Sequence, residues 1–153
     1  MNYLKVQSDI LKGLCKGNVH KVLRYVAKSG DGNEIYLICG SHFYILEKDF
    51  LFLDYERLVD KAGELQSNTL QNILKGADKS ELGEKTKQLE YIPAIKGNGV
   101  FLKSKNYEVV VDEKLLKNFE KNCAFYLSGE LSPVYIYEGG VLAGVIMPIA
   151  RKK

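Results

Sequence analysis

The sequence is poor in the residues that build metal sites and disulfide frameworks. It has three cysteines, two histidines and no tryptophan in 153 residues. The cysteines are odd in number and widely spaced, without a Cys-x-x-Cys pair, so we expect three reduced thiols, no structural zinc, and no metal or cofactor. Reduced, buried thiols are typical of a cytoplasmic protein, which is the location that we predict.

Long apolar runs and catalytic motifs are also missing. No apolar stretch approaches the roughly 18 residues of a membrane-spanning helix, and residues 1–9 lack the basic-then-apolar order of a signal peptide. There is no phosphate-binding loop, nucleophile elbow or zinc-protease motif, and His20 and His42 have no evident catalytic partner. We therefore expect no membrane partner and no enzyme, and keep an unrecognised enzyme only in reserve.

The composition is that of an ordinary globular domain. Hydrophobic residues make up 46% and charged residues 27% of the chain, and the net charge is +3 at pH 7. That charge permits contact with a polyanion but does not require it. We predict one domain over residues 1–153, with a first half at about 1–56, a polar and largely helical connection at about 57–90, and a second half at about 91–150.

A short internal repeat relates the two halves. Residues Val6–Gly17 match residues Val111–Asn122, which begin 105 positions later. We interpret each copy as a strand followed by a short helix. The expected strands are Tyr3–Val6 and Glu108–Val111, the expected N-caps are Ser8 and Asp112, and the expected left-handed helix ends are Gly17 and Asn122.

Each expected helix has an apolar face and a basic face. At about 100° per residue, one face carries Ile10, Leu11 and Leu14 in the first helix. The same face carries Leu115, Leu116 and Phe119 in the second helix. The basic faces carry Lys12 and Lys16 in the first helix, and Lys117 and Lys121 in the second. Two interpretations stay open, because flexible lysines suit non-specific contact with duplex DNA and are also common on solvated helix faces.

Strand signals follow each helix. They cover residues 20–28, 34–40 and 42–54 after the first, and 123–129, 133–140 and 141–149 after the second. Turns rich in glycine separate them. We therefore predict an α+β fold built from a duplicated β-α-β-β-β unit, with two helices on one side of antiparallel sheets.

The segment between the halves is less regular. Ser67 or Asn68 is expected to cap a helix that holds Leu70, Ile73 and Leu74. Residues 77–88 are polar and are interpreted as a solvated connection. Residues 91–105 are interpreted as extended chain with a turn at Gly97–Gly99.

The C-terminal stretch carries a family pattern in Lys114–Phe119, Leu131–Val134 ("LSPV") and Val145–Pro148 ("VIMP"). Over residues 109–151 it resembles the closing segment of the bacterial DNA polymerase III beta clamp, a DNA sliding clamp. The resemblance implies a DNA-clamp-like fold, a replication accessory role as a processivity factor, and contact with duplex DNA. One chain has room for one clamp domain, so a ring would be a homo-oligomer of about six copies. So compact a version would suit a phage or a mobile element.

The same resemblance implies a peptide site. In the family, the final strand and a histidine-containing strand end help to form the pocket that holds polymerase and clamp-loader peptides. Residues 39–44 ("CGSHFY") are the counterpart of that strand end. The candidates are His42, Tyr44, Val145, Ile146, Met147 and Pro148. We expect Met147 at the rim of an apolar cleft and not fully enclosed.

Bland alternatives stay open for the same residues. The final strand can equally be a core strand that ends at the edge of a sheet, and Arg151–Lys153 are expected to form a solvated tail. The second function hypothesis is a protein–protein interaction module that has the clamp fold but neither forms a ring nor binds DNA.

Overall fold

The computed structural model describes residues 1–17 and 22–150, which form two compact units. The N-terminal unit is Asn2–Leu74, and the C-terminal unit begins at Lys75 and also includes Met1. Both units combine helices with antiparallel strands, which confirms the expected α+β class. The boundary at Leu74 lies inside the predicted connection at 57–90. Arg151–Lys153, the expected tail, and His20 lie outside the described residues.

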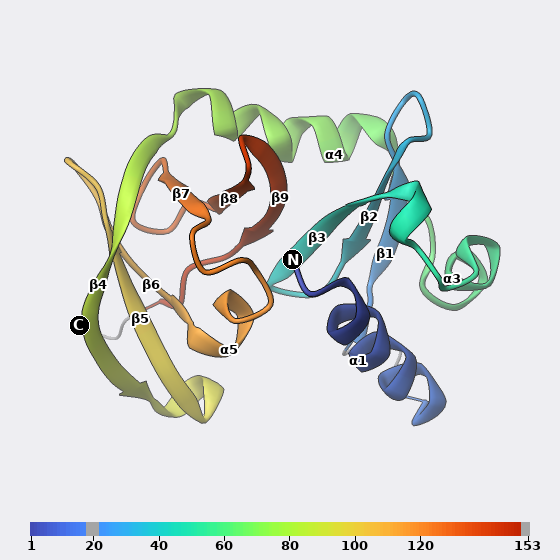
Figure 1. The fold of residues 1–153 in the computed structure, drawn as a ribbon, viewed down its shortest axis with the longest axis horizontal. Coiled ribbons are helices and arrows are strands. Elements are labelled where there is room, and N and C mark those ends of the chain that lie inside the picture. The colour runs from blue at the N-terminus through green and yellow to red at the C-terminus, as the bar shows by residue number, and fades with distance from the viewer. Residues whose placement is uncertain (18–21, 151–153) are drawn as a thin grey trace. The chain divides into compact units, whose positions relative to one another are not determined.

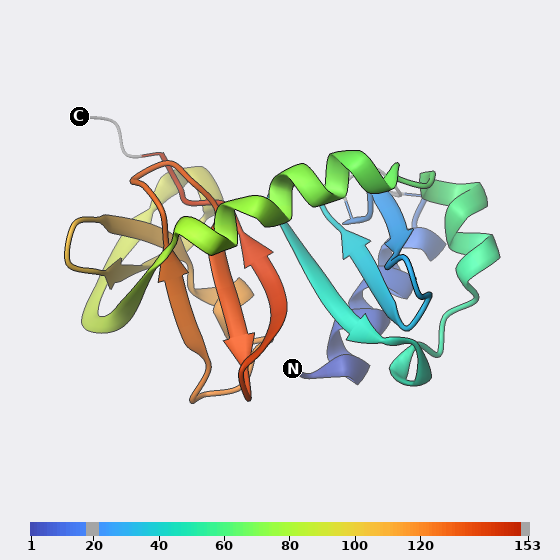
Figure 2. The same cartoon turned by 90° about the horizontal axis from the view of Figure 1, so that it is seen from above.

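The N-terminal unit contains a meander of three antiparallel strands with helices before and after it (Figures 1 and 2). Its elements are α1 (Tyr3–Cys15), β1 (Tyr25–Lys28), β2 (Glu34–Ile38), β3 (His42–Glu47), α3 (Tyr55–Ala62) and α4 (Ser67–Leu74). The β1–β2 turn is ordered by Asp31, whose carboxylate accepts hydrogen bonds from the Ser29 hydroxyl at 2.6 Å and the Asn33 N–H at 2.9 Å. Three strands lie within the segments expected at 20–28, 34–40 and 42–54, but β3 ends at Glu47, so residues 48–54 are not part of the strand expected there.

The segment Tyr3–Val6 is the first turn of α1, so the expected strand is wrong. The cap is Asn2 and not Ser8, because the Asn2 side chain accepts a hydrogen bond from the Lys5 N–H at 3.0 Å. The helix end at Gly17 is confirmed, with φ at 72°. The Asn2 cap lies directly before this segment, and Tyr3–Val6 contains no run of β-branched residues that would favour a strand. The segment can therefore be helical.

The buried face of α1 also differs from the expected one. It consists of Val6, Gln7, Ile10 and Gly13, whereas Leu11 is 46% exposed. Gly13 sets this rotation, because a Cβ there would lie 2.1 Å from Cγ2 of Val22. Gln7 is fully buried, and its amide bonds to the Phe50 carbonyl at 2.8 Å and the Phe52 N–H at 2.9 Å. A polar residue can occupy this core position because its hydrogen bonds are made.

The C-terminal unit is built from antiparallel strands in the order β9-β8-β7-β4-β5-β6. Its elements are β4 (Glu81–Ile92), β5 (Gly97–Lys103), β6 (Glu108–Asp112), α5 (Glu113–Leu116), β7 (Ala124–Leu127), β8 (Val134–Glu138) and β9 (Val141–Ile146). β4 pairs with two different strands along its length: residues 81–83 pair with β7, and residues 84–92 pair with β5. Beyond β9, the Ile149 N–H donates to the Val110 carbonyl of β6 at 2.8 Å.

The second copy of the repeat has the expected element order. β6, α5, β7, β8 and β9 follow one another as β-α-β-β-β, and Asp112 caps α5 by accepting from the Lys114 N–H at 2.9 Å. The helix itself ends at Leu116 after four residues, short of Asn122. Among the described residues other than glycine, Lys96 is the one with positive φ, so the left-handed end expected at Asn122 is wrong. The duplicated unit is therefore complete only in this copy.

The segment between the halves needs two corrections. The helix with Leu70 is confirmed as α4, but the second part of the expected solvated connection is strand β4. The turn lies at Pro93–Lys96, with Lys96 left-handed at φ 51°, and not at Gly97–Gly99. Gly99 is instead a residue of strand β5. Glycine is required there because a Cβ would lie 2.4 Å from Cγ1 of Val110 on the neighbouring strand.

Candidate functional site

A hollow of about 470 Å³ opens on the C-terminal unit where β4 leaves β7 and begins to pair with β5. Its lining residues come from β4 and from the end of β5 with the turn that follows. They are Leu82, Glu84, Lys85, Thr86, Lys103, Ser104 and Lys105. Three of the seven are lysines, so the hollow offers positive charge to a ligand. The Thr86 hydroxyl is a further donor, whereas the Ser104 hydroxyl donates to Glu81.

Two similar tripeptides contribute residues to the hollow, and of their six residues all but Lys87 line it. Lys85-Thr86-Lys87 lies on β4 and Lys103-Ser104-Lys105 lies at the end of β5, and Lys103 pairs with Glu84 directly before the first tripeptide. We call them the lysine tripeptides. Sequence reasoning missed this site, although the repeated Lys-hydroxyl-Lys pattern was a signal. Its meaning depends on the β4–β5 register, which joins segments that are 18 positions apart.

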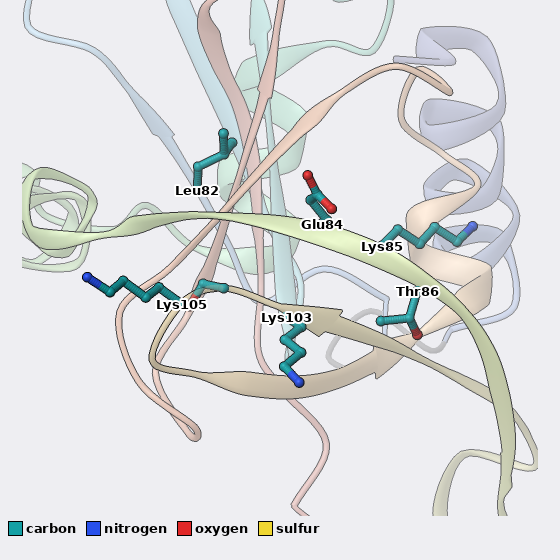
Figure 3. A pocket seen from close by; sticks show the side chains of 7 residues that line it. Leu82, Glu84, Lys85, Thr86, Lys103 and Lys105 are labelled. Carbon is teal, nitrogen blue, oxygen red and sulfur yellow. The ribbon is translucent and has the colours of Figure 1, made fainter.

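The lysine side chains at the hollow spread over its surface (Figure 3). Lys85 and Lys105 point in opposite directions, and Lys103 extends to the same side of the ribbon as Thr86. Glu84 extends to the other side. Because the ammonium groups diverge, the arrangement suits several anionic groups along a polymer better than one small anion.

A carboxylate beside the hollow orders the turn between β5 and β6. Glu81 accepts hydrogen bonds from the Ser104 hydroxyl at 3.0 Å, from the Asn106 N–H at 3.2 Å and from the Asn106 side-chain amide. The bonds from Asn106 and Ser104, with the nearby Lys105 charge, lower the pKa of Glu81 below its ordinary value of 4.5. Glu81 is therefore ionised at neutral pH.

The lysines expected to contact DNA are all exposed. Lys12 lies on α1, away from its buried face, and Lys16 is the residue that ends this helix. Lys117 is the C-cap directly after α5 and forms an ion pair with Glu113 at 3.6 Å. Lys121 lies in the turns after α5, so the expectation that Lys117 and Lys121 share one helix face is wrong.

The residues expected to bind a peptide divide into core and surface. Val145, Ile146 and Tyr44 are at most 4% exposed, so their side chains belong to the core and offer no surface to a ligand. His42 is partly exposed, and its ring makes an edge contact with Tyr44 at 5.2 Å between centroids. Met147 is 40% exposed, which confirms that it is not enclosed, and Pro148 is partly exposed. None of the six lines the hollow described above.

The described residues contain no group of three or more His, Cys, Asp or Glu side chains that could hold a metal ion. The three cysteines are free thiols, with Cys15 exposed, Cys39 buried and Cys123 between the two. Burial raises the pKa of Cys39 to about 12. In the same part of the chain, no helix has the length and apolar character needed to cross a membrane.

Comparison with protein-family models, with curated proteins and with solved structures finds no significant match. The resemblance to sliding clamps accordingly stays a prediction from the sequence. The geometry of the hollow is the firmest guide to function.

Proposed function

We propose that the protein is a non-enzymatic accessory protein that binds the phosphate backbone of duplex DNA without reading its sequence. The observation that carries this proposal is the meeting of the two lysine tripeptides at one surface hollow. Lysine ammonium groups release counterions when they approach phosphates, and this release supplies most of the free energy of non-specific binding. The Thr86 hydroxyl adds a donor to phosphate oxygens.

The arrangement favours backbone contact over base readout. Lysine is a flexible point charge, whereas base recognition usually relies on planar groups such as arginine or amide side chains. The hollow is lined by no arginine, asparagine or glutamine. Binding is expected to be weak for one chain, because Glu84 lines the same hollow and offsets part of its positive charge.

The more specific form of the proposal is a clamp-like replication accessory protein. It is supported by the β-α-β-β-β order of β6, α5, β7, β8 and β9. In this form Lys12, Lys16, Lys117 and Lys121 add further contacts to duplex DNA. Several copies in a ring would act on one duplex together, and a polymerase or clamp-loader peptide would bind beside the exposed Met147.

A second candidate is a protein–protein interaction module without DNA binding. It is favoured by large apolar side chains exposed on β4, where Leu82, Leu89 and Tyr91 are 60%, 51% and 63% exposed. Tyrosine and leucine side chains in such positions are typical of surfaces that bind another protein.

Salt titration of DNA binding tests the first proposal and separates it from the second. The wild type is measured with two unrelated duplexes of equal length and is expected to bind both with similar affinity. The variant Lys103→Glu/Lys105→Glu is expected to lose at least about tenfold in affinity at low salt, and its slope of log affinity against log salt should fall by about 1.8.

The matched control is Lys48→Glu/Lys61→Glu, which makes the same charge change at exposed residues of the N-terminal unit. We expect its affinity to stay within about threefold of the wild type. The DNA proposal fails if the wild type does not bind at low salt, or if the two variants weaken binding equally. Absence of binding would leave the interaction module as the better proposal.

A further inference from the structure

The turn that carries one lysine tripeptide is highly ordered for a surface turn. The Ser104 N–H donates to the Tyr107 carbonyl at 2.8 Å, and the Tyr107 N–H donates to the Ser104 hydroxyl at 3.1 Å. Ser104 is 8% exposed although it stands between exposed Lys103 and Lys105. The lysines therefore extend from a fixed backbone, and the buried hydroxyl helps to fix it.

Glu81 holds this turn from a distant part of the sequence. It is the first residue of β4 and lies 23 positions before Ser104 and 25 before Asn106. Its carboxylate accepts one hydrogen bond from Ser104 and two from Asn106. Hydrogen bonds to an ionised carboxylate are stronger than those between neutral groups, so Glu81 adds a strong tie between β4 and the turn.

A carboxylate at this place has two effects of opposite sign on an anionic ligand. Its negative charge repels phosphate, whereas its hydrogen bonds hold Lys103 and Lys105 where they reach the hollow. We propose that Glu81 is a positioning residue for backbone phosphates and that its positioning effect outweighs its repulsion. This inference rests on the proposed DNA binding and assigns to Glu81 a favourable role that its charge alone would not indicate.

Glu84 provides an internal comparison. It lines the hollow and is exposed, and the described structure records no hydrogen bond from a neighbour to its carboxylate. Removing its charge therefore removes repulsion without loosening the turn. Glu81→Gln and Glu84→Gln make the same change in charge at positions of β4 that are three residues apart, so a difference in affinity between them reports the hydrogen bonds of Glu81.

The test measures affinity for one DNA duplex at low salt. Glu84→Gln is expected to raise affinity by about twofold, because one repelling charge is lost. Glu81→Gln is expected to lower affinity by about threefold or more, because the turn loses its charged acceptor. If Glu81→Gln raises affinity as Glu84→Gln does, Glu81 acts only through its charge and the inference is overturned.

A charge-neutral variant and a measurement without DNA complete the test. Asn106→Ala removes the side-chain amide donor to Glu81 and keeps the backbone N–H donor. It is expected to weaken binding in the same direction as Glu81→Gln, and wild-type affinity would contradict the inference. Amide hydrogen exchange of Tyr107 should be faster in Glu81→Gln than in Glu84→Gln.

The exchange measurement separates failure of this inference from failure of the proposed function. If the wild type does not bind DNA, the proposed function fails. Exchange that is faster in Glu81→Gln but not in Glu84→Gln would still support the structural tie between Glu81 and the turn. Equal exchange in both variants would overturn the tie itself.

Discussion

The two parts of the C-terminal unit differ in charge although they form one set of paired strands. Residues 75–105, which include β4 and β5, contain seven Lys or Arg against four Asp or Glu. Residues 106–150, which include β6 to β9, contain three against six. All the residues that line the hollow belong to the first part, and Lys117 and Lys121 belong to the second. A lysine whose charged neighbours are mostly positive is therefore a better candidate for phosphate contact than a lysine that merely lies on a helix surface.

A methyl group added at Gly99 is expected to disturb the packing of β5, in residues 75–105, against β6, in residues 106–150. Gly99→Ala would place a Cβ 2.4 Å from Cγ1 of Val110 and 3.0 Å from Cγ1 of Ile92, so we expect a loss of about 2 kcal/mol in the free energy of unfolding. Chemical denaturation measures it. Gly97→Ala on the same strand is the control, since its Cβ would meet only ordinary contacts near 3.8 Å. Equal stability of the two variants would show that β5 and β6 are not in close contact at Gly99.

The difference in charge between residues 75–105 and 106–150 is tested by reversing the charge of two lysines in each part. We expect Lys103→Glu/Lys105→Glu to weaken DNA binding at least about tenfold and Lys117→Glu/Lys121→Glu about threefold or less, although both change the charge equally. The reason is that Lys117 already pairs with Glu113 and that acidic residues outnumber basic ones around it. A larger loss from the second variant would favour the helix-end lysines expected from the sequence over the hollow.

The smallest expected effect is the pH dependence that Glu81 gives to stability. Its pKa is lower in the folded protein than in the unfolded chain, so the unfolded state binds more protons as the pH falls, and stability is lost in acid. We expect wild type to exceed Glu81→Gln in stability at pH 7, and the difference to shrink as the pH falls below 4.5. Thermal unfolding between pH 3 and pH 7 measures it. A difference that stays constant over this range would mean that the Glu81 hydrogen bonds do not depend on its charge.

The sequence predicted well those elements whose local signals agree with one another. β1–β3 and β7–β9 follow apolar runs separated by glycine-rich turns, and Asp112 caps α5 as expected. The repeat led to a wrong prediction before α1. The two copies share the spacing of apolar residues in their helices, but the residues that precede this pattern differ. Val109–Val111 favour a strand, whereas the segment after Asn2 has no such run. Local context decided between strand and helix.

Strand β4 and the hollow were harder to predict for a common physical reason. Most of β4 is exposed, its middle residues 84–88 are all polar, and the strand shows little of the alternation that marks a half-buried strand. Without β4, the two lysine tripeptides are unrelated stretches of sequence. Only the pairing of Glu84 with Lys103 brings them to one surface, and pairing registers depend on contacts that are distant in sequence.

The double pairing of β4 has a consequence for the order in which the unit folds. β4 meets β5 across a short turn, but it meets β7 only after β5, β6 and α5 have been made, and Ile149 reaches Val110 later still. Because closing a short loop loses less chain entropy than closing a long one, we expect the β4–β5 hairpin to form first and β7 to join afterwards. The hollow lies where β4 passes from one partner to the other, so it becomes complete only when both pairings exist. A nascent chain released before β7 would carry all the lysines of the site without the scaffold that gives them a shared surface.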